Sequence, residues 1–224
     1  VVTCPEDFAV CCDDAGFELT GATPAGGTYL LNGEPVTQFE PDCGNTGDFE
    51  VTYLYVDPET GCESLCGFTI TVNSLPVVTC PEDFAVCCDA DPFELSGAIP
   101  EGGTYYLDGE PVTTFTPDCG SPGDSEITYE YADPATGCVG LCSFIITVNS
   151  VPEVTCPENI SVCCYDEPFE LFGATPEGGT YYLDGEPITT FVPDCENEGD
   201  HEITYVYQDP TNLCEGSCSF TVTV

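Results

Sequence analysis

The chain of 224 residues contains 41 Asp and Glu, one His and no Lys or Arg, so its formal net charge is −41 at pH 7. Because phosphate groups and anionic lipids are bound by cationic side chains, nucleic acid and anionic membrane surfaces are excluded as partners. No apolar run approaches the roughly 20 residues that a membrane-spanning helix needs, so no membrane insertion is expected.

Six cysteine positions recur three times with a fixed spacing and no insertion, which makes the chain a tandem array of one small module. We place the first repeat at 1–76, the second at 77–152 and the third at 153–224. A module of this size buries a limited core and gains stability from disulfides, which form in oxidising compartments. We therefore expect a secreted protein, outside the cytoplasm or on the cell surface. The chain starts at a repeat boundary without Met, so we expect a processed product or a section of a longer chain.

Each repeat predicts about seven short strands, because β-branched and aromatic residues alternate with polar ones at a period of two. Gly and Pro clusters separate these runs and indicate turns. In the first repeat we expect strands at Val2–Cys4, Phe8–Cys12, Phe17–Thr20, Thr28–Leu31, Val36–Phe39, Glu50–Val56 and Gly67–Val72.

The pair Asn32-Gly33 predicts a tight hairpin, and Asp108-Gly109 and Asp184-Gly185 take its place in the other repeats. Regularly spaced short strands of this kind favour an antiparallel sandwich, so the fold class is all-β, with three tandem immunoglobulin-like modules. Short linkers containing Pro76 or Pro152 leave little room for swivelling, and we expect an extended, stiff rod.

Two segments point to a known family. "VTCPEDFAV" near the start of a repeat and "CSFTVTV" near its end resemble the hyalin-repeat (HYR) type of immunoglobulin-like module. "FELTGATPAGGTY" followed by "EVTYLYVDPETGC" is similar to tandem repeats of giant surface adhesins in Bacteroidetes, including gliding-motility adhesins. The resemblance covers the whole module three times and implies an extracellular stalk or filament rather than an enzyme.

The same resemblance implies one set of disulfides. In hyalin-type repeats the Cys of "TCP" bonds the Cys that opens the last strand, which gives Cys4–Cys66, Cys80–Cys142 and Cys156–Cys218 here. An immunoglobulin topology agrees, since it places both residues near the starts of neighbouring strands. In the chain-entropy model a loop of this size is worth about 4 kcal/mol.

The remaining cysteines leave alternatives open. Adjacent Cys11 and Cys12 point to opposite faces of a strand and should bond different partners. Either of them fits Cys43, and we assign Cys12–Cys43, Cys88–Cys119 and Cys164–Cys195. Cys62 lies in the last hairpin turn, too far from the vicinal pair of its own repeat for a disulfide. One hypothesis bonds Cys11 or Cys12 to Cys138, and Cys87 or Cys88 to Cys214, across repeats; the alternative keeps every bond within one repeat.

Other chemistry is less well supported by the residues. Cys62 and Cys66 fit a zinc ligand pair loosely, but the chain has one His and its composition favours an extracellular protein. No cofactor is expected, although Asp13, Asp14 and Asp57 are candidate ligands for Ca²⁺ in acidic turns. Repeated carboxylates on turns lack a cleft for glycoside hydrolysis, so we expect no enzyme.

Three further features have structural interpretations. His201 stands where other repeats have Phe49 and Ser125, as expected for a surface strand position. Tyr29, Tyr105-Tyr106 and Tyr181-Tyr182 of the predicted hairpins could bind sugars, but ordinary cross-strand packing is the favoured explanation. Asn159-Ile160-Ser161 is a glycosylation sequon that the other repeats lack.

We therefore predict a structural repeat region of an extracellular adhesin, stalk or filament, whose partners are neighbouring repeats of a longer chain or filament. The alternatives are modules that bind calcium or a surface glycan, and subunits of a self-assembling fibre.

Overall fold

The computed structural model describes all 224 residues and contains 21 strands and no helix. The first repeat contains β1 (Phe8–Cys11), β2 (Phe17–Glu18), β3 (Thr28–Leu31), β4 (Glu34–Val36), β5 (Gln38–Phe39), β6 (Gly47–Val56) and β7 (Glu63–Asn73). The second contains β8 (Phe84–Cys87), β9 (Phe93–Glu94), β10 (Thr104–Leu107), β11 (Glu110–Val112), β12 (Thr114–Phe115), β13 (Gly123–Ala132) and β14 (Val139–Asn149). The third contains β15 (Ile160–Ser161), β16 (Phe169–Glu170), β17 (Thr180–Leu183), β18 (Glu186–Ile188), β19 (Thr190–Phe191), β20 (Asp200–Gln208) and β21 (Glu215–Thr223).

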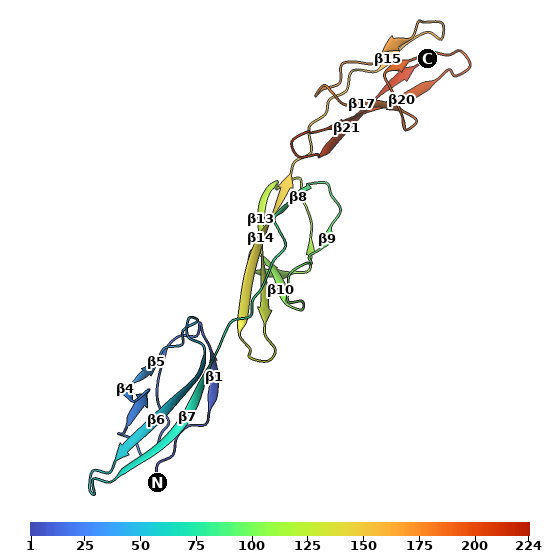
Figure 1. Cartoon of the computed structure of the whole chain (residues 1–224). Helices are drawn as coiled ribbons and strands as arrows, with labels where there is room; N and C mark the ends of the chain where they lie inside the picture. The colour runs from blue at the N-terminus through green and yellow to red at the C-terminus, as the bar shows by residue number, and fades with distance from the viewer. The chain divides into compact units, whose positions relative to one another are not determined.

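Each repeat forms a small immunoglobulin-like β-sandwich. In the first repeat a five-stranded sheet with the order β1-β7-β6-β3-β4 faces a two-stranded ribbon of β2 and β5, and the other repeats have the same arrangement (Figure 1). The long β6–β7 hairpin is antiparallel, whereas β1 runs parallel to β7. The all-β fold class predicted from the sequence is confirmed. No helix in the structure is long and apolar enough to cross a membrane.

Several strand predictions differ from the structure, and the predicted strand Phe17–Thr20 is shortened to β2, Phe17–Glu18. The predicted strand Val36–Phe39 is divided at Thr37, because β4 pairs with β3 in one sheet while β5 pairs with β2 in the other. The predicted strand Val2–Cys4 is reduced to one bridge between Thr3 and Thr23. The strands β6 and β7 are longer than predicted, since their pairing continues beyond the apolar runs into the turns.

The predicted two-residue hairpin turn is confirmed in all three repeats, with Asn-Gly in the first and Asp-Gly in the other two. Leu31 pairs with Glu34, so two residues make the turn, and both have positive φ, 54° at Asn32 and 84° at Gly33. These dihedral angles match a type I′ turn, whose twist suits antiparallel strands.

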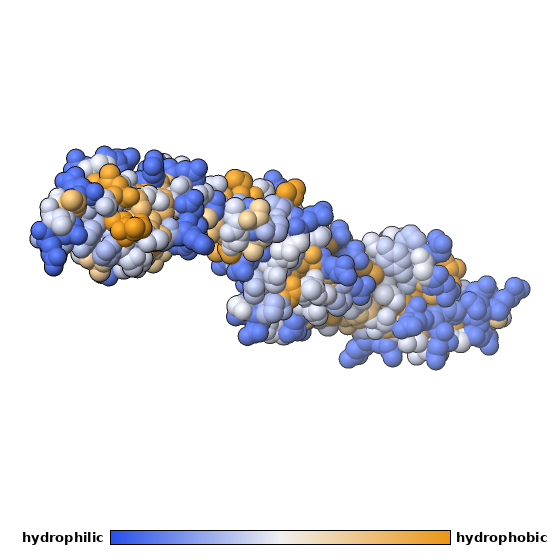
Figure 2. Space-filling model, turned by 90° about the horizontal axis from the view of Figure 1, so that it is seen from below, coloured by the Kyte–Doolittle hydropathy of each residue, from blue (hydrophilic) through white to orange (hydrophobic).

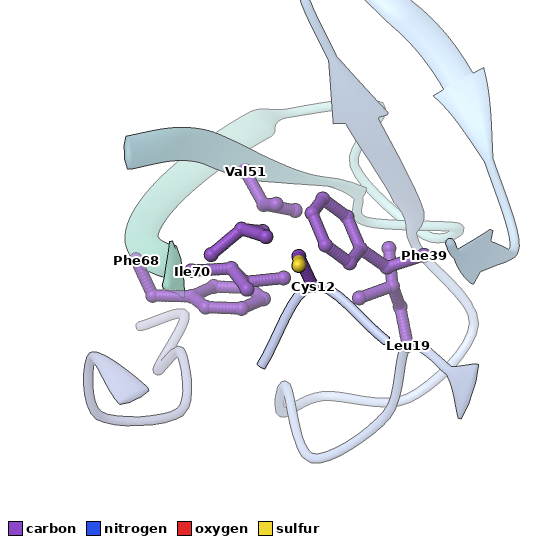
Figure 3. Packing of buried hydrophobic residues seen from close by; sticks show 7 residues of the cluster. Cys12, Leu19, Phe39, Val51, Phe68 and Ile70 are labelled. Atoms are coloured by element: carbon purple, nitrogen blue, oxygen red, sulfur yellow. The ribbon is translucent and has the colours of Figure 1, made fainter. Parts of the chain in front are cut away.

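The core of the first repeat lies between its five-stranded sheet and its ribbon. Side chains from both layers converge there, as Figure 3 shows for Cys12, Leu19, Phe39, Val51, Phe68 and Ile70. The third repeat repeats this cluster with Leu171, Phe191, Ile203, Phe220 and Val222. Apart from three tyrosines, no polar or charged side chain is buried, and hydrophilic residues form much of the surface visible in Figure 2.

Contacts between Cα atoms divide the chain into two compact units. The first comprises Val1–Pro81, Ser96–Val112 and Thr128–Ser143, and the second comprises Glu82–Leu95, Thr113–Ile127 and Phe144–Val224. Each unit therefore contains one terminal repeat and part of the second repeat. The rod shape expected from the linkers, and the domain boundaries at 76/77 and 152/153, stay predictions.

Candidate functional site: disulfides within and between repeats

Eight disulfides of three kinds connect sixteen of the cysteines. The closing disulfides join the segment before the first strand to the last strand of the same repeat, with Cα atoms 5.7 Å apart. They are Cys4–Cys66, Cys80–Cys142 and Cys156–Cys218. These are the pairs that the family resemblance implies. Each closes a loop with a sequence separation of 62 residues, so it restricts nearly the whole repeat in the unfolded state.

The core disulfides join the end of the first strand to the turn before the sixth. They are Cys12–Cys43, Cys88–Cys119 and Cys164–Cys195. Cys12 and Cys88 are buried, and the backbone N–H of Cys12 donates a hydrogen bond to the carbonyl of Asn73 at 2.9 Å. The structure thus places the assigned member of the vicinal pair, Cys12, inside the sandwich.

The junction disulfides join successive repeats. They are Cys11–Cys138 and Cys87–Cys214, each with a sequence separation of 127 residues and Cα atoms 5.6 Å apart. The sequence allows either Cys11 or Cys12 in a bond across repeats, and in the structure it is Cys11 that bonds Cys138. The first of these bonds lies within the first compact unit and the second within the other.

A period of two explains which member of each vicinal pair bonds where. Val10 and Cys12 point toward the core. Phe8, on the same face of β1, is 38% exposed and stacks on Phe68 with ring centroids 6.2 Å apart. Ala9 and Cys11 then face the other side of β1. This alternation can be recognised in the sequence FAVCC, where it indicates that Cys12 forms the core disulfide.

The second cysteine of each junction disulfide, Cys138 or Cys214, lies in the turn between the two longest strands of its repeat. In the second repeat this turn is closed by hydrogen bonds from the N–H of Asp133 to the carbonyl of Cys138, at 2.9 Å, and from the N–H of Gly137 to the carbonyl of Asp133, at 2.7 Å. Cys138 is 1% exposed in its disulfide. We call the equivalent segments, 57–62, 133–138 and 209–214, the junction turns.

A carboxylate organises each junction turn. Asp57 accepts hydrogen bonds from the backbone amides of Thr60 and Glu59, at 3.0 and 2.9 Å, and these bonds hold the pKa of Asp57 below its usual range. In the third repeat the side chain and the amide of Thr211 lower the pKa of Asp209 in the same way. Asp57, a calcium candidate of the sequence, therefore has a structural role in the turn.

Glycine allows the linker to pass close to the junction. A Cβ on Gly140 would collide with the carbonyl oxygen of Pro76 and with Cγ2 of Val78, and a Cβ on Gly216 would meet Pro152 and Val154 in the same way. The equivalent position in the first repeat is Ser64. The sequence analysis missed this difference. An alignment of the three repeats shows it, because Ser64 stands where the other repeats have Gly140 and Gly216.

The other calcium candidates lie beside a junction. Asp13 and Asp14 are exposed, and their carboxylates lie within 4.8 Å of each other and of the Cys11 sulfur. That sulfur is bonded to Cys138, and one oxygen of Asp14 accepts the N–H of Cys11 at 2.8 Å. This geometry explains Asp14 as part of a turn; calcium binding stays a prediction.

The remaining candidate residues serve the fold. The ring of Tyr29 packs against that of Tyr53 at 4.7 Å, and Tyr105 and Tyr181 have matching partners. His201 is half-buried rather than fully exposed, since its ring meets Phe191 edge-on at 5.4 Å, as Phe49 meets Phe39 in the first repeat. The side-chain oxygen of Asn159, in the sequon, accepts the N–H of Thr221 at 2.9 Å, the role of Asp7 toward Thr69 in the first repeat.

Comparison with known proteins gives one similar sequence and several similar folds. Hyalin of Strongylocentrotus purpuratus is 24% identical over 210 residues, which are 80% of this chain and 16% of hyalin. The chain thus spans about a sixth of the length of this curated relative. No protein-family model matches.

Among solved structures, the I67–I69 I-band fragment of titin has a TM-score of 0.40 and 12% identity, covering 98% of this chain and 96% of that one. Drosophila N-cadherin EC1-3 has a TM-score of 0.28 and 12% identity, covering 98% of each chain. The similarity to hyalin agrees with the hyalin-repeat resemblance of the sequence motifs.

Proposed function

We propose that the chain is a structural repeat region of an extracellular surface protein, a stalk or filament in which disulfides limit extension under load. The observation that carries this proposal is the pair of junction disulfides, Cys11–Cys138 and Cys87–Cys214. Bonds within a repeat stabilise that repeat, whereas bonds between repeats also connect each repeat to the next independently of the linker.

The eight disulfides create a short covalent route through the chain. Starting at Val1, this route follows the backbone and crosses three disulfides, Cys11–Cys138, Cys142–Cys80 and Cys87–Cys214, before it ends at Val224. It contains roughly 35 residues and reaches roughly 120 Å when fully extended, whereas the reduced chain reaches roughly 750 Å. The oxidised chain therefore cannot extend beyond this length, even when its strands separate.

Composition and disulfide content support the extracellular setting. Disulfides persist in oxidising compartments, and 16 of the 18 cysteines are bonded. A surface without Lys or Arg also offers no site to proteases that need a basic residue. The finer assignment to a bacterial surface adhesin rests on the sequence motifs and is part of this proposal.

The role is structural rather than catalytic. The repeated carboxylates accept hydrogen bonds within turns, as Asp42 does from the N–H of Gly44 at 2.9 Å and Asp57 does within its junction turn. Each carboxylate of this kind recurs in equivalent turns, such as Asp118 with Gly120. Binding of a surface glycan stays a prediction.

Single-molecule pulling from the two termini tests the mechanical proposal. We expect the oxidised chain to stop lengthening at roughly 120 Å, and the same molecule to approach roughly 750 Å after addition of a reductant. An oxidised chain that lengthens by several hundred ångström would contradict the proposal. Antibody labelling of intact source cells tests the location, and labelling that requires permeabilised cells would contradict it.

A further inference from the structure

Two thiols remain outside the eight disulfides, and they occupy related positions. Cys62 and Cys163 are free and exposed. Cys62 corresponds to Cys138 and Cys214, and Cys163 corresponds to Cys11 and Cys87. They therefore occupy the two kinds of position that a junction disulfide joins, one in the first repeat and the other in the third.

We propose that Cys163 of one chain bonds Cys62 of a second copy, so that the chains join head to tail through the same junction that joins repeats within a chain. The partner surface is thus the first repeat of another molecule. This inference deepens the proposed structural function and rests on it.

The junction turn holding Cys62 already has its bonded conformation. The N–H of Asp57 donates to the carbonyl of Cys62 at 2.9 Å, and the distance between the equivalent atoms of Asp133 and Cys138 is also 2.9 Å. The N–H of Gly61 donates to the carbonyl of Asp57 at 2.8 Å, as Gly137 does to Asp133 at 2.7 Å. Forming the bond at Cys62 thus requires no rearrangement of the turn.

Cys163 makes the same turn contacts as its bonded counterpart, although it lies beyond β15, whereas Cys11 is the last residue of β1. The N–H of Cys163 donates to the carboxylate of Asp166 at 2.8 Å, and Cys11 donates to Asp14 at the same distance. Its carbonyl accepts the N–H of Asp166 at 2.9 Å, closing the turn. The turn also contains Tyr165, which is 90% exposed where Asp13 and Asp89 stand in the other repeats. An exposed aromatic ring beside the free thiol supplies contact area that the charged residues do not.

The residue next to the first junction turn favours a second chain as the partner. Gly140 and Gly216 lie directly under the linkers that enter their repeats, and a Cβ at either position would collide with a linker carbonyl. Ser64 has that Cβ. A linker on the same path would collide with Ser64, whereas a separate molecule can bring its cysteine to Cys62 without laying a linker across residue 64.

The coupling requires an oxidant, and a small disulfide such as oxidised glutathione suffices. The Cys163 thiolate attacks it, forming a mixed disulfide and releasing one reduced glutathione. The Cys62 thiolate of the second chain then attacks the Cys163 sulfur and releases the other. Two protein thiols lose their protons and two electrons, and the oxidised glutathione becomes two thiols.

The test uses two variants that each retain one half of the junction. Cys62→Ser leaves Cys163 free, and Cys163→Ser leaves Cys62 free; since both residues are unbonded and exposed, all eight disulfides remain. One variant is isotope-labelled, and both are incubated separately and together with a glutathione couple. About 0.5 M NaCl shortens the Debye length to roughly 4 Å and screens the repulsion between the acidic chains.

We expect heterodimers in the mixture to exceed homodimers by about tenfold, with a Cys62–Cys163 peptide in non-reducing mass spectrometry. The unaltered chain should form a ladder of multiples. A statistical mixture of dimers, or no cross-linked product, would overturn the proposal. So would native material in which Cys62 is bonded to a cysteine outside residues 1–224. The pulling experiment on single chains does not involve these thiols, so its result is independent.

Discussion

The hydroxyl of Tyr53 accepts a hydrogen bond from the N–H of Gly27 at 2.6 Å, and the ring of Tyr53 occupies the space that a Cβ on Gly27 would need. The same hydroxyl donates to the carbonyl of Pro24 at 2.7 Å. Tyr129 and Tyr205 make the matching contacts in the other repeats. This pair fixes the loop before β3 onto the sheet.

Removal of that hydroxyl should destabilise the first repeat. Tyr53 is 2% exposed, so Tyr53→Phe leaves two backbone groups without their partner, at a cost of about 1–3 kcal/mol. Chemical denaturation of the oxidised protein measures the loss. Tyr55→Phe, on the same strand but half-buried, is the matched control and should change the free energy of unfolding little; equal effects would contradict this role of Tyr53.

A glycine at position 213 should stabilise the third repeat. Leu213 has φ of 64° where Gly61 and Gly137 have 71° and 78°, and its side chain is 65% exposed. Because a non-glycine residue in this region costs of order 1 kcal/mol, Leu213→Gly should raise the free energy of unfolding by about that amount. The reverse change, Gly137→Leu, should lower it. Thermal unfolding of both variants measures the effect, and a loss of stability in Leu213→Gly would contradict it.

The glycine under a linker should not tolerate a side chain. Gly140→Ser would place a Cβ against Pro76 and Val78, so we expect a loss of about 1–3 kcal/mol or incomplete formation of Cys11–Cys138. Counting free thiols by mass spectrometry detects the second outcome. Ser64→Gly, the reciprocal change in the first repeat, is the control and should leave the disulfides complete. An unaffected Gly140→Ser variant would show that the linker can shift.

The junction turn should weaken in acid. Backbone amides of Thr60 and Glu59 hold the pKa of Asp57 below its ordinary value of 3.8. A lowered folded-state pKa stabilises the protein above the unfolded-state pKa, and this contribution is lost as the pH falls through the folded value. The stability difference between the unaltered chain and Asp57→Ala should therefore be largest above pH 3.8 and shrink below it. Denaturation across this range measures it.

Asp13→Ala is the charge-matched control for that experiment. It removes one exposed carboxylate that has no comparable pair of backbone bonds. A difference for Asp57→Ala that does not depend on pH, or one that Asp13→Ala reproduces, would contradict the role assigned to Asp57.

Salt should stabilise the whole chain. With a net charge of −41 and no Lys or Arg, self-repulsion opposes folding. The melting temperature should rise as NaCl increases from about 0.01 to 0.5 M, since the Debye length falls from roughly 30 to 4 Å. CaCl₂ at equal ionic strength separates screening from specific binding at Asp13 and Asp14. A larger rise in melting temperature with CaCl₂ than with NaCl would support the predicted calcium site. A melting temperature that does not change with NaCl would contradict the argument that self-repulsion opposes folding.

Local patterns predicted the turns and the longest strands, because their signals are contained in a few neighbouring residues. Asn32-Gly33 needs no distant partner to specify its turn. The division of Val36–Phe39 at Thr37 was missed because it depends on which sheet each half joins, and that is decided by contacts with β2 and β3.

The disulfides also divide into those that local sequence patterns indicate and those that depend on contacts between distant residues. The alternation of Phe8, Val10 and Cys12 assigns Cys12 to the core. The bond between Cys11 and Cys138 depends on contacts between successive repeats. The sequence alone therefore leaves two hypotheses, bonds across repeats and bonds within one repeat.

Considered together, the disulfide loops overlap without a gap. Cys4–Cys66, Cys11–Cys138, Cys87–Cys214 and Cys156–Cys218 enclose every peptide bond from Cys4 to Cys218 in at least one ring, including those of both linkers. A protease that cuts any single bond in this stretch therefore releases no fragment. The chain therefore stays covalently connected after one peptide bond is cut anywhere between Cys4 and Cys218. For the linkers, only the junction disulfides provide this protection.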